Sequence, residues 1–265
     1  MRMSNNMEKI TIFTPTYNRA YVLPNLYKSL LRQTNKCFIW IIVDDGSTDQ
    51  TKQLVQQWIT ERYIKIEYFN QNNQGKSMAH NKGVSLTKTE LFTCVDSDDY
   101  LSADAIENIL ALWEKSGGGD RVGILAYKGY ANGKSITEIR DKRCTYTTLR
   151  NAYSKYGLMG DTMLIFKTKV IKKFKFPYFS GEKFVPEAYL YDQIDQAGEL
   201  IILRKTLYYC QYLEDGYTNN MAKLLVNNPQ GYIVYIKQRL YIDLSLRDRI
   251  TDTIRYTAMC CTVWT

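Results

Sequence analysis

Residues 91–100 read Leu-Phe-Thr-Cys-Val-Asp-Ser-Asp-Asp-Tyr. A mostly apolar run, Leu91 to Val95, is followed by three carboxylates within four positions, at residues 96, 98 and 99. If the strand stays extended, Asp96 and Asp98 point to the same face while Asp99 turns aside, because side chains alternate along a strand. Two carboxylates on one face repel each other unless a cation lies between them. A hard divalent ion such as Mg²⁺ or Mn²⁺, carrying a phosphate, suits that position. The alternative is an acidic turn before the next helix, since turns favour Asp.

The chain on both sides of this stretch alternates strand-like and helix-like segments. The continuous apolar run from Phe38 to Val43 is typical of a buried parallel strand. Strand patterns alternating with helical spacing predict an α/β fold, with a parallel sheet flanked by helices and two further helices after Pro229. Strands are expected at residues 10–13, 38–43, 63–69, 91–96, 122–130, 135–140, 163–166, 200–203 and 207–212.

Polar side chains follow four of these strands at the point where each strand ends. The clusters are residues 16–18, 44–45, 70–76 and 96–99. Residues beyond the carboxyl ends of parallel strands line one crevice, which is where such sheets bind ligands. We therefore expect the four clusters to form one site.

The four clusters resemble the motifs of family 2 glycosyltransferases of the GT-A fold. The resemblance covers roughly residues 9–115, and residues 176–187 look like the acceptor-side segment of that family. The matching motifs are Pro15-Thr16-Tyr17-Asn18-Arg19, Val43-Asp44-Asp45-Gly46-Ser47-Thr48-Asp49, Asn73-x-Gly75-Lys76-x-x-Ala79-x-Asn81-x-Gly83 and Val95-Asp96-Ser97-Asp98-Asp99.

The resemblance implies a Rossmann-like GT-A domain over residues 1–225, with a mixed, mainly parallel sheet. Its nucleotide-sugar-binding half would be residues 9–115 and its acceptor-binding half residues 116–225. Residues 226–265 would form a C-terminal helical segment. Because the chain stops in the apolar Val263-Trp264-Thr265 without a stop signal, we expect the natural protein to continue.

The resemblance also assigns roles to residues in the clusters. Tyr17 would stack on the nucleobase, and Asp45 would accept a hydrogen bond from uracil, although Asp44 and Asp45 are alternatively acids that cap a helix. Asp98 would hold Mn²⁺ or Mg²⁺, with Asp96 as a further metal ligand or close to the ribose. Lys76 would meet a phosphate or the base. The implied nucleotide-sugar-binding residues are Pro15, Thr16, Tyr17, Asn18, Arg19, Asp44, Asp45, Gly75, Lys76, Asn81, Asp96 and Ser97.

An inverting transfer needs a base beside the acceptor hydroxyl, and relatives place an Asp or Glu there. Glu187 is the first candidate and Glu182 the second. Many relatives carry Glu-Asp at this point, whereas Ala188 follows Glu187 here. The alternative is that Glu187 is a first-turn helix residue after Pro186. Gly160-Asp161-Thr162 is expected to approach the sugar, and residues 214–219 to form a lid or a surface turn.

Composition excludes several other classes of protein. The chain has one histidine, His80, which we interpret as structural, so no Ser/His/Asp hydrolase site is possible. Six cysteines without metal spacing suit a reducing cytosol. The net charge of +8 implies an anionic partner, with nucleic acid the least favoured. Arginines 247, 249 and 255 with the Lys167–Lys175 cluster would rest on anionic lipid, or form a solvated or oligomeric face.

The first functional hypothesis is a metal-dependent, inverting transfer of sugar from a UDP-sugar to an acceptor hydroxyl. The chain lacks a Q-x-x-R-W element and any apolar run of bilayer length, so we expect one transfer per acceptor. The expected acceptor is a bacterial surface glycan on a lipid carrier, such as capsule, O-antigen or exopolysaccharide, at the inner face of the plasma membrane. The second hypothesis, based on Ala188, is a binding or scaffold protein that keeps the fold without turnover.

Overall fold

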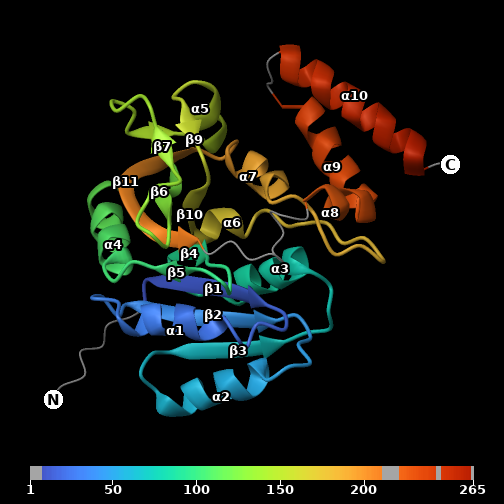
Figure 1. Ribbon diagram of the computed structural model, residues 1–265. Helices are drawn as coiled ribbons and strands as arrows, with labels where there is room; N and C mark the ends of the chain where they lie inside the picture. The colour runs from blue at the N-terminus through green and yellow to red at the C-terminus, as the bar shows by residue number, and fades with distance from the viewer. Residues whose placement is uncertain (1–7, 211–220, 243–245, 264–265) are drawn as a thin grey trace.

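The computed structural model describes residues 8–210, 221–242 and 246–263, whose arrangement is shown in Figure 1. The first half alternates strands and helices, as its alternating apolar patterns predict. Its elements are β1 (Ile10–Thr16), α1 (Leu23–Leu31), β2 (Phe38–Asp44), α2 (Thr51–Glu61), β3 (Ile66–Asn70), α3 (Lys76–Leu86), β4 (Leu91–Cys94), β5 (Tyr100–Leu101) and α4 (Ala105–Ser116).

The second half combines two long strands with several short elements and ends in helices. The expected loop at residues 214–219 lies outside the described residues. The elements are β6 (Arg121–Tyr130), β7 (Glu138–Ile139), β8 (Tyr146–Thr147), α5 (Leu149–Ser154), β9 (Leu158–Met159), β10 (Thr162–Lys167), α6 (Thr168–Ile171), α7 (Ala188–Ile194), β11 (Glu199–Cys210), α8 (Met221–Asn227), α9 (Pro229–Leu240) and α10 (Leu246–Val263).

One sheet runs through both halves. In the part of the chain that the structure describes, its order is β3-β2-β1-β4-β10-β6-β11-β5, with β8 paired to β11. Strands β3, β2, β1 and β4 are parallel, and β10 is antiparallel to both β4 and β6. The predicted fold class, a mixed, mainly parallel sheet flanked by helices with helices at its C-terminal end, is confirmed.

Some strand boundaries differ from those predicted. Strand β4 ends at Cys94, two residues before Asp96, because the chain turns there: the Asp99 N–H donates to the Asp96 carbonyl (3.2 Å). The expectation that strand alternation places Asp96 and Asp98 on one face was therefore wrong. The two strands expected at 200–203 and 207–212 are one strand, β11, whose pairing with β6 shifts register in between.

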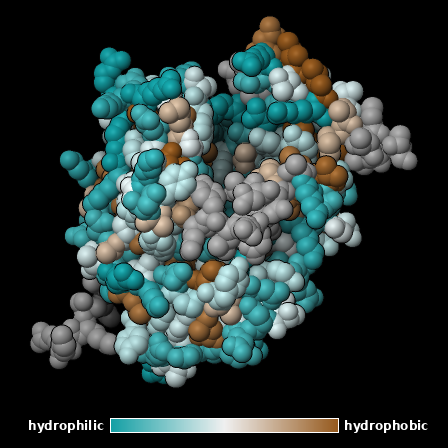
Figure 2. Space-filling view, viewed as in Figure 1, coloured by the Kyte–Doolittle hydropathy of each residue, from teal (hydrophilic) through white to brown (hydrophobic). Residues whose placement is uncertain are grey.

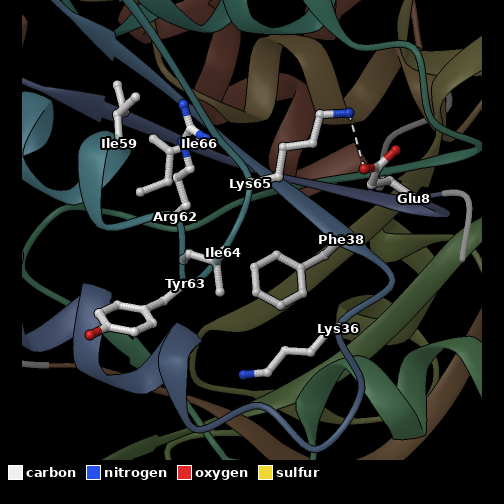
Figure 3. Close-up of a pocket in the computed structure, with 9 residues that line it drawn as sticks. All are labelled: Glu8, Lys36, Phe38, Ile59, Arg62, Tyr63, Ile64, Lys65 and Ile66. Atoms are coloured by element: carbon white, nitrogen blue, oxygen red, sulfur yellow. Dashed lines mark hydrogen bonds and ion pairs between the residues drawn. The ribbon is translucent and has the colours of Figure 1, made fainter. Parts of the chain in front are cut away.

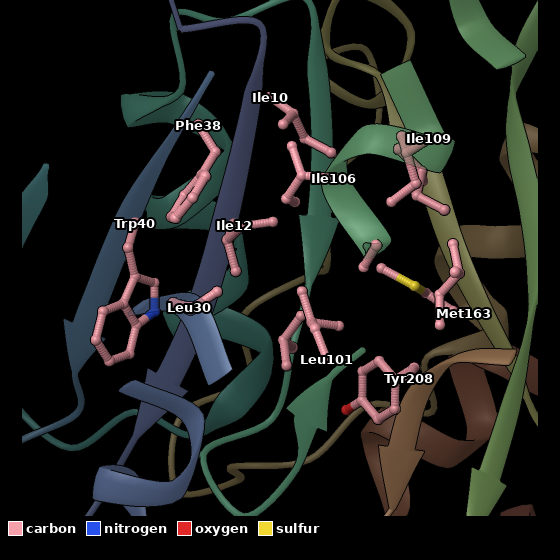
Figure 4. Close-up of a cluster of buried hydrophobic side chains, with 14 of the residues drawn as sticks. Ile10, Ile12, Leu30, Phe38, Trp40, Leu101, Ile106, Ile109, Met163 and Tyr208 are labelled. Carbon is pink, nitrogen blue, oxygen red and sulfur yellow. The ribbon is translucent and has the colours of Figure 1, made fainter. Parts of the chain in front are cut away.

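Two apolar clusters lie on the two faces of the sheet, as side-chain alternation along β1 and β2 requires. One gathers residues of α1, α2 and α4 over Ile12 and Trp40, and the other gathers residues of α3, α5, α6 and α7 over Phe13. Figure 4 shows part of the first cluster, in which Trp40 and Tyr208 are among the largest fully buried side chains. The hydroxyl-bearing end of Tyr208 reaches from this core toward the acidic turn.

The C-terminal helices pack beside α7 at one end of the molecule (Figure 1). The Asn228 side-chain oxygen accepts the N–H groups of Lys183 and Phe184, and a 2.6 Å ion pair between Arg239 and Asp252 joins α9 to α10. Figure 2 shows apolar side chains gathered over α10, where Ile254 is 64% exposed. No described helix combines the length and the apolar character that crossing a bilayer requires.

The Lys167–Lys175 cluster is exposed except at Lys167. Lys167 is buried, donates to the Gly119 carbonyl (3.2 Å) and lies over the Trp113 ring. Lys172 donates to the Thr87 carbonyl (2.6 Å). The charge of Lys167 is therefore used inside the fold, whereas the other lysines of the cluster stay at the surface.

Candidate active site

The loops after β1 and β2 are joined at the carboxyl edge of the sheet. Asn18, with φ 52°, donates its N–H to the Ser47 hydroxyl (2.8 Å), and its side-chain oxygen accepts the Thr48 N–H (2.8 Å). Asn18, predicted to bind the nucleotide, therefore holds two loops together. Tyr17 beside it is 47% exposed, as stacking on a nucleobase would require.

The paired acids after β2 are both buried and hydrogen-bonded. Asp44 accepts the Tyr68 phenol (2.5 Å), whereas Asp45 accepts the N–H groups of Gln74 (2.9 Å) and Gly75 (2.7 Å). Asp45 thus fixes the turn that leads into α3. These bonds stabilise loops, and the bond to Gly75 lies at the N-terminus of α3, where the helix-capping alternative places an acid. Reading of uracil by Asp45 stays a prediction.

The other predicted nucleotide-sugar residues occupy varied positions. Pro15 and Thr16 are buried in β1, and Ser97 is buried in the acidic turn. Arg19 contributes its carbonyl to the start of α1 and its guanidinium to the Tyr21 hydroxyl (2.5 Å). These contacts connect the loop after β1 with α1.

Gly75 allows a distant segment to cross the start of α3. Its φ is +89°, and a Cβ at this position would lie 1.9 Å from the Lys183 carbonyl oxygen, so no other residue fits without a shift. Next to it, the Val185 N–H donates to the Ser77 hydroxyl (3.3 Å). The crossing brings Glu187, at the N-terminus of α7, beside Lys76 at the start of α3.

Lys76 bridges two carboxylates from distant parts of the chain. Its ammonium lies 2.7 Å from Asp96 Oδ1 and 2.8 Å from Glu187 Oε1. Burial opposes the charge on Lys76, but the carboxylates of Asp96 and Glu187 outweigh it and raise the pKa of Lys76. The positive charge of Lys76 in turn lowers the pKa of Glu187. The structure therefore brings together three of the predicted site residues.

The acidic turn is fixed from behind by Tyr208 of β11. The Tyr208 phenol donates to Asp99 Oδ2 (2.6 Å) and accepts the Asp96 N–H (3.1 Å). Asp98 is half-buried, and burial followed by the charge of Asp96 raises the pKa of Asp98. The charge of Asp96 therefore acts on Asp98 within the turn, although neither residue belongs to β4.

A cavity of about 260 Å³ opens beside the Lys76 bridge. Lys128 lines it and forms a 2.8 Å ion pair with Asp161, whose side chain is 59% exposed. Asp161 was expected near the sugar, but Lys128 was not identified, because one lysine within a strand of small and apolar residues carries no motif. His80 also lines the cavity, edge-on to Phe13 and Phe92, and burial lowers the pKa of His80 to about 4.

Neither Glu182 nor Asn81 is brought to the group of Lys76, Asp96 and Glu187. Glu182 Oε1 and Oε2 accept the N–H groups of Gln230 (2.9 Å) and Gly231 (2.8 Å) at the start of α9. The Asn81 side chain pairs with the backbone of Phe176 through bonds of 2.9 and 3.0 Å. Both side chains are thus occupied in holding segments of the fold.

A wider hollow of about 410 Å³ lies at the opposite edge of the sheet (Figure 3). It is lined by residues at the amino ends of β2 and β3, among them Lys36, Lys65 and Tyr63. The predicted site motifs contribute none of its lining residues. The smaller cavity is therefore the candidate active site.

The acidic turn has the donor chemistry for Mn²⁺ or Mg²⁺. Asp96 and Asp98 offer carboxylate oxygens, which both ions prefer, and a cation would offset the burial of Asp98. Among the described residues, no group of three or more His, Cys, Asp or Glu side chains is arranged to hold a metal ion. A cation at this turn therefore needs further ligands from a bound phosphate or from water.

The chain resembles known glycosyltransferases in sequence. An uncharacterized glycosyltransferase of Rickettsia conorii is 36% identical over 111 residues, which cover 42% of this chain and 18% of that protein. The poly(ribitol-phosphate) beta-N-acetylglucosaminyltransferase TarS of Staphylococcus aureus is 27% identical over 238 residues, covering 86% of this chain and 39% of TarS. The chain thus spans well under two thirds of the length of these relatives.

Solved structures share the fold. TarS residues 1–349 in complex with UDP-GlcNAc gives a TM-score of 0.68 at 21% identity, covering 95% of this chain and 72% of that one. The mannosyltransferase PcManGT of Pyrobaculum calidifontis, in complex with GDP-Man and Mn²⁺, gives a TM-score of 0.60 at 14% identity. The match covers 94% of this chain and 69% of that one. The pattern described as glycosyl transferase family 2 matches residues 11–174, more than half of the chain. The chain is therefore a member of glycosyl transferase family 2, with the GT-A architecture that its strand-end motifs predict.

Proposed function

We propose that this protein transfers a sugar from a nucleoside diphosphate sugar, namely a UDP-sugar, to an acceptor hydroxyl with inversion at the anomeric carbon. The single observation that supports this best is the Lys76 bridge, which joins the acidic turn on the donor side to Glu187 on the acceptor side. Membership in the family and the UDP-GlcNAc complex of TarS support a nucleotide-sugar donor.

In the proposed reaction the acceptor oxygen forms a bond to the anomeric carbon, and the bond from that carbon to the diphosphate breaks. The electron pair of the broken bond leaves with the nucleoside diphosphate, and Glu187 takes the proton of the acceptor hydroxyl. Lys76 stabilises the negative charge of the diphosphate. Asp98 and Asp96 would hold Mn²⁺ or Mg²⁺, which supplies Lewis-acid stabilisation of the leaving group.

The acceptor and the place of action are also proposals. We propose that the acceptor is a growing surface glycan, which can be linked to a lipid carrier. We also propose that the protein adds one sugar per encounter with the acceptor. Support comes from TarS, whose name describes transfer to a poly(ribitol-phosphate). We also propose that the protein acts in the cytoplasm, at the inner face of the plasma membrane. The free thiols of Cys94, Cys144 and Cys210 support this location, because they suit a reducing compartment.

The test is to incubate the protein with Mn²⁺ and a panel of UDP-sugars and to measure released UDP, first with water and then with candidate glycans as acceptors. We expect release with one or a few donors. Glu187→Gln should lower turnover by about 10²–10⁴-fold while UDP binding is retained. Turnover at the wild-type rate in that variant would contradict the role of Glu187, and failure of every nucleotide to bind would contradict the proposed function.

A further inference from the structure

Lys76 serves two sides of the proposed reaction at once. The acidic turn after β4 belongs to the donor side, and Glu187 at the start of α7 to the acceptor side. The ammonium of Lys76 touches a carboxylate of each, at 2.7 and 2.8 Å. A diphosphate needs this cation, whereas a base needs its oxygens available for the acceptor hydroxyl. While Lys76 pairs with Glu187, its charge is shared between the two sides and the Glu187 carboxylate is a weaker proton acceptor.

The geometry allows Lys76 to change partners. Lysine carries a compact charge with three rotatable donors on a flexible stem, so its ammonium exchanges between anions without movement of the backbone. The backbone around it is fixed, because the Gly75 N–H is held by Asp45 and a side chain at Gly75 would meet Lys183. The Glu187 side chain is 47% exposed, so its release requires no opening of the core.

The second cation of the cavity has its own partner. Lys128 pairs with Asp161 and lies over the Tyr208 ring, with its ammonium 4.4 Å from the ring centroid. In the described part of the chain, Glu187 forms its ion pair with Lys76, and the Tyr191 hydroxyl donates a long hydrogen bond to Glu187 Oε2 (3.4 Å). An incoming diphosphate that draws Lys76 away would therefore free Glu187 from its ion pair.

We propose that Lys76 positions Glu187 according to the state of the donor site. Without nucleotide, Lys76 holds the Glu187 carboxylate; when the diphosphate enters, Lys76 moves to the phosphate oxygens and leaves Glu187 to receive the proton of the acceptor. The donor then binds before the acceptor, and the base is withheld until the leaving group is in place. This inference rests on the proposed function, because it assigns the phosphate and the base to this site.

Competition for one ammonium predicts that Glu187 opposes nucleotide binding. The affinity for UDP, with and without Mn²⁺, can be measured by calorimetry for the wild type, Glu187→Gln, Lys76→Met and the double variant. We expect Glu187→Gln to bind UDP about two- to fivefold more tightly than the wild type, since a partly exposed ion pair no longer competes. Lys76→Met should weaken binding, and in that background Glu187→Gln should have no effect.

Asp161→Asn is the matched control, because it removes one negative charge from the same cavity without touching Lys76. The exchange of Lys76 between Glu187 and the diphosphate is supported if Glu187→Gln raises the affinity for UDP more than Asp161→Asn does. This gain in affinity should also vanish in the Lys76→Met background. Equal effects of the two variants, or a gain that persists without Lys76, would show a general charge effect and overturn it. A wild type that binds no UDP would instead overturn the proposed function. Glu187→Ala serves as a second variant if Glu187→Gln does not fold.

Discussion

The phenol of Tyr208 donates a 2.6 Å hydrogen bond to Asp99 and accepts the backbone N–H of Asp96, so a residue of β11 fixes the acidic turn after β4. Tyr208 is buried, and burial is the first cause that raises the pKa of its hydroxyl. The side chain therefore stays a neutral donor at physiological pH. The turn that offers Asp96 and Asp98 to a cation is held by this contact from a strand more than 100 residues away.

Tyr208→Phe tests this support. The variant keeps the buried ring but removes the donor to Asp99, and groups that orient metal ligands typically contribute about tenfold or more to metal affinity. We expect the Mn²⁺-dependent part of UDP binding to weaken by about that factor, as measured by calorimetry with and without Mn²⁺. Tyr209→Phe is the control, because the Tyr209 ring stacks on Tyr100 instead. Equal losses in both variants would refute the role of Tyr208.

Asp98→Asn tests the cation at the acidic turn. Burial and the charge of Asp96 raise the pKa of Asp98, so the ionised carboxylate is disfavoured until a cation offsets it. The neutral amide should leave the metal-free protein as stable as the wild type or more so. It should also remove the gain in UDP affinity that Mn²⁺ provides, by about tenfold or more. Both effects are measured by thermal unfolding and calorimetry, and a retained Mn²⁺ dependence would exclude Asp98 as a ligand.

The sequence predicted the parallel strands and the strand-end clusters, because both depend on local patterns of apolar and polar residues. It did not predict the contact between Lys76 and Glu187, since that contact requires residues 182–187 to cross Gly75. Lys128 and Tyr208 were missed for a similar reason: each lies within a strand, and only the pairing of β6 with β11 brings them together. Local spacing thus indicated the strand ends at which polar residues gather, and tertiary packing decided which of these side chains touch.

Glu182 and Glu187 can be separated by comparing stability with turnover. Glu182 accepts two backbone N–H groups at the start of α9, whose removal typically costs about 0.5–2 kcal/mol. Glu182→Ala should therefore lower the free energy of unfolding by that amount, measured by urea titration, while UDP release stays near the wild-type rate. Glu187→Gln should instead lower the rate of UDP release by about 10²–10⁴-fold, while the free energy of unfolding stays near that of the wild type. If Glu182→Ala abolished turnover without loss of stability, the assignment of the base would need to be reversed.

His80 makes stability depend on pH. Burial among aromatic rings lowers its pKa from 6.5 to about 4, so below pH 6.5 the unfolded chain binds a proton that the folded protein does not. Stability from His80 is therefore present above pH 6.5 and is lost as the pH falls toward 4, which amounts to about 1.4 kcal/mol between pH 7.5 and 5.5. His80 is the single histidine of the chain, and His80→Phe keeps an aromatic ring among Phe13, Phe92 and Phe176. Urea unfolding at the two pH values should show a pH-dependent loss smaller by about 1.4 kcal/mol in the variant, because phenylalanine cannot titrate. An equal loss in both proteins would mean that His80 is protonated in the folded state.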